Sequence, residues 1–183
     1  MQTEDLRIYL DLEYIYPGMN AGSGRPTQKD LRQIVQIGAI LFDNDQGKEL
    51  SVLNILTIPA YNKELPPFFV ELTGIDKKQL EEEGISFERG FKELVSFCGD
   101  HPVWTFDKDQ EVLEQNCSYF NIEFPWQKFE RVKPKLIQWG IAPNDYSSGT
   151  LYQAVGLEMS GQVHNALHDV RSMAGAVHVL EKN

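Results

Sequence analysis

The chain carries, close to its N-terminus, the stretch Ile8-Tyr9-Leu10-Asp11-Leu12-Glu13, which predicts a strand with two acids on one face. Side chains alternate between the two faces of a strand, so Asp11 and Glu13 point away from the side that Ile8, Leu10 and Leu12 share. Strand interiors disfavour Asp and, to a lesser degree, Glu. A divalent cation such as Mg2+ would hold such a pair through its carboxylate oxygens. A solvated strand edge is the simpler alternative.

A second acid and a histidine precede an amphipathic helix near the C-terminus. Apolar residues recur there at spacings of three and four, which is typical of a helix that packs on a core; they are Leu167, Val170, Met173, Ala174, Val177 and Leu180. Asp169 lies in the first turns of this helix and His164 lies at its entrance. Two simpler interpretations stay open: Asp169 as an acid favoured by the helix dipole, and His164 as a surface histidine.

A third acidic position follows a short apolar run in the middle of the chain. Residues 103–106 read as a buried strand, and Asp107 or Asp109 would then open a helix. An acid at that place can simply cap free backbone N–H groups. One of the two acids is expected to do only that.

Together these residues resemble the DEDDh 3'-to-5' exonucleases, the DnaQ-like group of the ribonuclease H-like superfamily. Asp11-Leu12-Glu13 is similar to the first motif of that family, and His164 with Asp169 is similar to its His-x4-Asp motif. Asp109 with the apolar Leu113 four residues later fits the middle motif. The family usually has an aromatic residue directly before this Asp, whereas this chain has a lysine there. Asp107 is therefore kept as the alternative, although it would put Glu111 at the apolar position.

Two further segments extend the resemblance. Residues 69–75 contain Leu-Thr-Gly-Ile, which is similar to a segment between the first two motifs, and residues 33–39 resemble the second strand. Asp-Leu-Glu-Tyr and the Pro-Pro-Phe-Phe run at 66–69 look most like the exoribonuclease branch, which includes histone-mRNA and siRNA-trimming enzymes and their bacterial relatives. The resemblance runs from about Leu6 to Leu180, nearly the whole chain.

The resemblance implies the chemistry and the residues that perform it. Four acids would hold two Mg2+ or Mn2+ ions; they are Asp11, Glu13, Asp109 and Asp169. His164 would be the general base, since histidine can take a proton from water near neutral pH, and His168 is the next candidate. Contacts to the terminal nucleotide are expected from Tyr14, Leu72 and Thr73.

The implied function is hydrolysis of phosphodiester bonds from the 3' end of RNA or single-stranded DNA, with release of nucleoside 5'-monophosphates. An oligoribonuclease-like enzyme and a proofreading exonuclease are alternatives within the family. A non-catalytic interaction module on the same fold is the alternative from another class. Because relatives often dimerise, a homodimer is compatible with this interpretation.

The pattern of elements predicts an α/β fold with one exonuclease domain over residues 1–183. We expect a ribonuclease H-like, mixed five-stranded sheet flanked by helices, with three antiparallel N-terminal strands followed by parallel strands. Strands are expected at 6–13, 34–43, 50–58, 102–106 and, short or irregular, within 124–132; helices are expected near 66–72, 76–83, 87–98, 109–120, 134–140, 149–155 and 164–181. The Gly- and Pro-rich segment 14–32 is expected to form a mobile loop that shapes the substrate entrance.

Composition limits the partners. The net charge of −10 argues against broad electrostatic binding to long nucleic acids, but it is compatible with a grip on a few terminal nucleotides. A basic stretch at 128–135 could guide a phosphate backbone or be a solvated face; its cations are Lys128, Arg131, Lys133 and Lys135. No apolar run is long enough to span a membrane, the N-terminus lacks a signal sequence, and Cys98 and Cys117 are expected to stay reduced, so a cytoplasmic location is expected.

Overall fold

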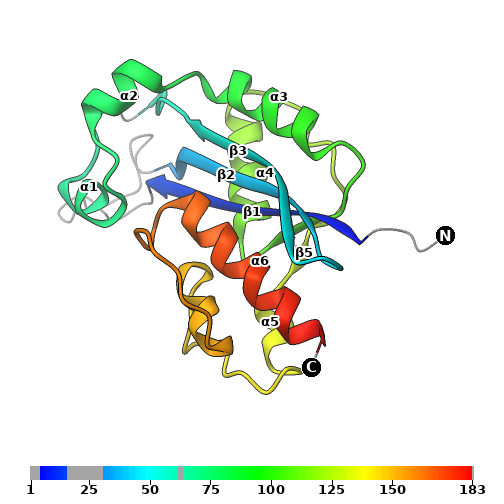
Figure 1. Ribbon diagram of the computed structural model, residues 1–183. Coiled ribbons are helices and arrows are strands. Elements are labelled where there is room, and N and C mark those ends of the chain that lie inside the picture. Colours follow the sequence, from blue (N-terminus) through cyan, green and yellow to red (C-terminus); the bar gives the residue numbers. More distant parts are fainter. Residues whose placement is uncertain (1–4, 16–30, 62–63, 183) are drawn as a thin grey trace.

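A five-stranded mixed sheet with helices on both faces forms the centre of the protein (Figure 1). The computed structural model describes residues 5–15, 31–61 and 64–182. The strands are β1 (Leu6–Ile15), β2 (Gln33–Asp43), β3 (Lys48–Leu56), β4 (Val103–Thr105) and β5 (Glu130–Arg131). The helices are α1 (Pro67–Thr73), α2 (Lys77–Glu83), α3 (Phe87–Cys98), α4 (Asp109–Tyr119), α5 (Lys133–Leu136), the 3-10 helix η2 (Ser148–Val155) and α6 (Ala166–Lys182).

The strand order is β3-β2-β1-β4-β5. β1, β2 and β3 pair in an antiparallel manner, whereas β4 pairs parallel to β1 and β5 pairs parallel to β4. The tight turn after β2 is closed by the N–H of Gly47, which donates to the carbonyl of Asp43 over 2.8 Å. β2 and β3 therefore form a hairpin, and the predicted fold class is confirmed.

Each face of the sheet has its own apolar core. On one face, α3 and α4 pack over β1 and β2, and the buried residues there include Ile8, Leu10 and Leu12. On the other face, α6 and η2 cover Tyr9 of β1 and Ile40 of β2. Figure 1 shows α6 lying across this second face. The alternation predicted for β1 is thus observed, and it directs Asp11 and Glu13 to the α6 side.

The element boundaries differ from the prediction in a few places. The helix expected at 134–140 ends at Leu136, and the chain then turns to Gly140, which has a φ of 73°. The last helix begins at Ala166 rather than at 164, because His164 has a left-handed φ of 66° that no α-helix accommodates. The greater part of the predicted entrance loop, residues 16–30, lies outside the described residues.

The described part of the chain supports two further observations. Cys98 and Cys117 are both buried and free, as expected from the sequence. Among the described residues, there is no helix with the length and apolar character that a membrane crossing needs.

Candidate active site

A glycine of β2 brings α6 into contact with the sheet beside the first two acids. Gly38 lies opposite Asp11 in the β1–β2 pairing. A Cβ at Gly38 would come 2.5 Å from the carbonyl carbon of Ala166 and 2.7 Å from the nitrogen of Leu167. The first turn of α6 therefore rests directly on the backbone of β2, and Asp169 follows in that same turn.

Side chains from the sheet and from the preceding turn hold the start of α6. The Oε1 atom of Gln36 accepts a hydrogen bond from the N–H of Ala166 over 3.0 Å. The Oδ1 atom of Asn165 accepts from the N–H of His168 over 3.3 Å, in the manner of a helix N-cap. These bonds satisfy the N–H groups of two residues in the first turn of α6, the turn that carries Asp169.

The middle acids have separate environments. Asp109 is the first residue of α4 and is 9% exposed. Asp107 is partly exposed and pairs with Lys133, with 3.4 Å between its Oδ2 and the lysine Nζ. The structure therefore places Asp109 with Asp11 in the buried acidic cluster, while Asp107 lies at its rim.

The four acids and His164 line one cleft of about 350 Å3. The acids come from β1, from the start of α4 and from the start of α6, and each of them is less than a tenth exposed. The remaining lining residues are Leu12, Tyr14, Phe69, Leu72, Phe106, Asp107, Lys108 and Ser148. The structure thus brings together in one place the five residues that the sequence motifs single out.

Burial and mutual repulsion make this cluster difficult to ionise. Burial, followed by the charges of the neighbouring acids, raises the pKa of Asp11 well above its usual range. The same causes raise the pKa of Glu13 to about 8. Burial raises the pKa of Asp109 to about 7, and it also raises that of Asp169, against a hydrogen bond from Ser148. A cation in the cleft would offset this repulsion and favour the charged carboxylates.

The donor atoms fit a divalent cation. One ligand atom from each of Glu13, His164 and Asp169 lies within 4.8 Å of the others. The Oδ1 atom of Asp169 is buried and accepts no hydrogen bond from any residue that the structure describes. Buried polar atoms normally have a partner, and carboxylate oxygens are ligands that hard cations prefer.

The three residues predicted to contact substrate are placed differently. Tyr14 and Leu72 line the cleft. Thr73 does not, because its hydroxyl is used at the end of α1. It donates to the carbonyl of Phe69 over 2.8 Å and accepts from the N–H of Ile75 over 3.1 Å.

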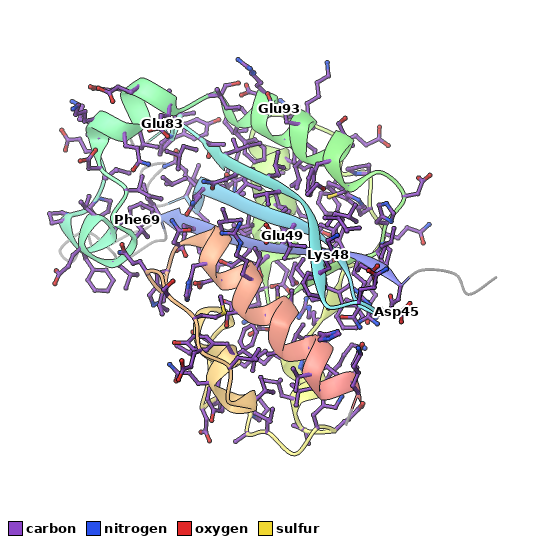
Figure 2. The ribbon with its side chains drawn as sticks, viewed as in Figure 1. Asp45, Lys48, Glu49, Phe69, Glu83 and Glu93 are labelled. Atoms are coloured by element: carbon purple, nitrogen blue, oxygen red, sulfur yellow. The ribbon has the colours of Figure 1, made fainter. Side chains whose placement is uncertain are left out.

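Sequence reasoning missed several lining residues. Phe69 is fully buried and lies where α1 meets the end of β1, as Figure 2 shows. The Pro-Pro-Phe-Phe run carried the family resemblance of this segment, but it did not single out Phe69 as a residue of the site. Ser148 comes from η2, and its Oγ donates to Oδ2 of Asp169 over 3.1 Å. No local pattern could have revealed it, because it reaches the acids only after η2 docks on α6.

The basic stretch at 128–135 is largely neutralised by acids. Arg131 pairs with Glu111 over 2.6 Å, and Lys135 pairs with Glu130 over 3.3 Å. Lys133 is paired with Asp107, as described above. Paired cations bind a phosphate backbone weakly, so the geometry favours the interpretation of a solvated face.

Solved structures with the same fold are exonucleases. The nuclease domain of 3'hExo, a DEDDh family member bound to rAMP, matches with a TM-score of 0.83 and 15% identity, over 99% of this chain and 94% of that chain. A 3'-exonuclease described by its recognition of the histone mRNA stem-loop matches with a TM-score of 0.82 and 15% identity, over 100% and 84%. E. coli Exonuclease I in complex with a dA16 oligonucleotide matches with a TM-score of 0.70 and 18% identity, over 98% and 41%.

The fold of the chain is that of the DEDDh nuclease domain of 3'hExo, and the four acids meet in one cleft of this fold. The RNase_T family model, described as an exonuclease, matches residues 8–177. The chain therefore belongs to this exonuclease family, and the predicted family is confirmed. A search of curated proteins finds no match to the chain.

Proposed function

We propose that this protein is a divalent-metal-dependent 3'-to-5' exonuclease that removes nucleoside 5'-monophosphates from RNA or single-stranded DNA. The observation that carries the proposal is the cleft in which four buried acids and His164 meet. The family and the fold agree with this chemistry.

The acids are assigned as the cation ligands. Asp11, Glu13, Asp109 and Asp169 would hold two Mg2+ or Mn2+ ions. When bound, such ions supply an activated water and offset the charge on the phosphate and on the leaving oxygen. The buried Oδ1 of Asp169, which has no hydrogen bond to a described residue, supports this assignment.

Hydrolysis joins a water oxygen to phosphorus and breaks the bond between phosphorus and the 3' oxygen of the preceding nucleotide. The shortened strand keeps that oxygen as a 3' hydroxyl, and the terminal nucleoside leaves with its 5' phosphate. His164 is assigned as the base that accepts the proton of the attacking water. It lines the cleft, and one of its ring nitrogens lies close to Glu13 and Asp169.

Apolar and aromatic side chains are assigned to the terminal nucleotide. Leu72 and Phe69 form the α1 wall of the cleft, where Leu72 can press against a base. Tyr14 lines the same cleft and offers a ring for stacking, which tolerates any base. Thr73 would act indirectly, through its hydrogen bonds at the end of α1.

The charge distribution favours a grip on a short 3' end rather than on a long backbone. The chain carries a net charge of −10, and most of its basic stretch is paired with acids. Short RNA and short single-stranded DNA are both candidates, because structural neighbours have been solved with rAMP and with dA16.

Digestion of 5'-labelled single-stranded RNA and DNA of matched sequence, with Mg2+ or Mn2+, tests the proposal. Shortening from the 3' end gives a ladder of labelled products, whereas attack from the 5' end releases labelled mononucleotide at once. EDTA and the Asp11→Ala variant should abolish the ladder. If neither polymer nor a dinucleotide is cleaved under any of these conditions, the non-catalytic interaction module replaces the proposal.

A further inference from the structure

Ser148 occupies the point where η2, α6 and β1 meet at the acidic cluster. It is the first residue of η2 and lines the cleft. η2 is fixed on α6 by two other polar contacts. The N–H of Tyr152 donates to Oγ of Ser172 over 3.1 Å, and Nε2 of His168 lies 3.2 Å from the carbonyl oxygen of Gly149. The backbone that carries Ser148 is therefore held independently of its hydroxyl.

The hydroxyl of Ser148 fixes the rotation of the Asp169 carboxylate. It donates to Oδ2 over 3.1 Å, while Oδ1 is buried without a hydrogen bond to any described residue. Gly149 lies against the other oxygen, because a Cβ at this position would overlap with Oδ1 of Asp169, so only glycine leaves room for the carboxylate. Ser148 and Gly149 therefore hold the carboxylate from two sides.

The Ser148 hydroxyl also lowers the pKa of the Asp11 carboxyl, against the larger effect of burial. The hydrogen bond to Asp169 is the direct contact between Ser148 and a predicted metal ligand. Residues that orient metal ligands from outside the coordination sphere typically change metal affinity or activity by about 10- to 100-fold when they are lost.

We propose that Ser148 is a positioning residue, which holds the Asp169 carboxylate in the orientation that binds the divalent cation. The inference rests on the proposed function, since it concerns the affinity of the same site. It adds a role for η2, an element that carries none of the family motifs.

Direct Mn2+ binding to the metal-free full chain, measured by isothermal titration calorimetry, separates this role from a structural one. The variants are Ser148→Ala, Ser148→Thr and Ser147→Ala. Ser147 is the matched control, because its Oγ lies 3.2 Å from Oγ1 of Thr150 at the start of the same helix, and because Ser147 does not line the cleft. Melting temperatures in EDTA report on the fold of each variant.

We expect Ser148→Ala to weaken Mn2+ binding by about 10- to 100-fold. Ser147→Ala should change it by less than about threefold, and Ser148→Thr should restore most of the affinity because it returns the hydroxyl. The rate of Ser148→Ala should recover at saturating Mn2+. The inference is overturned if Ser148→Ala binds as tightly as the wild type, or if both alanine variants weaken binding equally, as a loss of helix docking would do. Absence of Mn2+ and Mg2+ binding in the wild type would overturn the proposed function itself.

Discussion

Adding a single methyl group at Gly38 should damage the acidic site through the helix that carries Asp169. In the structure, a Cβ at this position would lie 2.5 Å from the carbonyl carbon of Ala166. Carbon atoms in contact prefer a separation of about 3.5–4.0 Å, so Gly38→Ala requires the first turn of α6 to retreat by about 1 Å. The neighbouring atom is backbone and cannot rotate away. Asp169 would move with this turn and away from Asp11, which lies opposite Gly38.

The magnitude follows from overpacking a close contact. Extra methylenes in a well-packed interior usually cost about 1–3 kcal/mol, so Gly38→Ala should lower the free energy of unfolding by that amount. In a chain of this length, a loss of 1 kcal/mol lowers the melting temperature by about 2–4 °C. Since ligand placement matters at the level of about 1 Å, the Mn2+ affinity should fall by at least about tenfold.

Urea unfolding and Mn2+ calorimetry measure the two effects, with Gly175→Ala as the control on the same helix. A Cβ at Gly175 would meet only a methyl carbon of Leu157 at 3.3 Å, and alanine is the better helix former by about 1 kcal/mol. Gly175→Ala should therefore leave Mn2+ binding unchanged and stability unchanged or slightly higher. If Gly38→Ala matches the wild type in stability and in Mn2+ affinity, the close packing of α6 on β2 does not position the site.

Three further predictions follow from the same cluster. The pKa values of Glu13 (about 8) and Asp109 (about 7) are raised in the folded protein. Above about pH 4, the folded protein therefore binds more protons than the unfolded chain. The free energy of unfolding in EDTA should consequently fall as the pH rises from about 5 to 8. Urea unfolding at several pH values measures this fall, and saturating Mn2+ should remove most of it. A free energy of unfolding in EDTA that does not change with pH would contradict the burial of these acids. Asp109→Asn should lower the cleavage rate by at least about 100-fold. Asp107→Asn loses only a partly exposed ion pair with Lys133, so its rate should stay within about threefold of the wild type. Equal losses of rate in a labelled-strand assay would contradict the assignment of Asp109 as a metal ligand. His164→Ala should remove most turnover and leave Mn2+ binding largely intact. Undiminished turnover would show that His164 is not the general base.

Much of the fold could be predicted because the strands and helices carry strong periodic patterns. The alternation in Ile8–Glu13 gave both the strand and the face on which its acids lie. The boundary of α6 could not be predicted from periodicity, because His164 adopts a left-handed φ of 66° and the helix begins two residues later. The first turn is also held by hydrogen bonds to Gln36 and Asn165, which the pattern of apolar residues does not encode.

The candidate site could be predicted as far as its residues carry local motifs. The acids and His164 follow family spacing, and the structure places them in one cleft. The choice between Asp107 and Asp109 depends on the folded structure, because only the fold shows that Lys133 pairs with Asp107. Ser148 could not be predicted as a residue of the site, because its hydrogen bond to Asp169 depends on how η2 and α6 pack together.

The most direct test of the account is anomalous diffraction from crystals of the wild type soaked in Mn2+. The account predicts Mn2+ peaks within the cleft, at bonding distance from the carboxylates of Asp11, Glu13, Asp109 and Asp169, and no such peaks in an Asp11→Ala crystal. Peaks that lie outside the cleft, or a wild-type cleft without any peak at saturating Mn2+, would contradict the claim that these acids form the metal centre of an exonuclease.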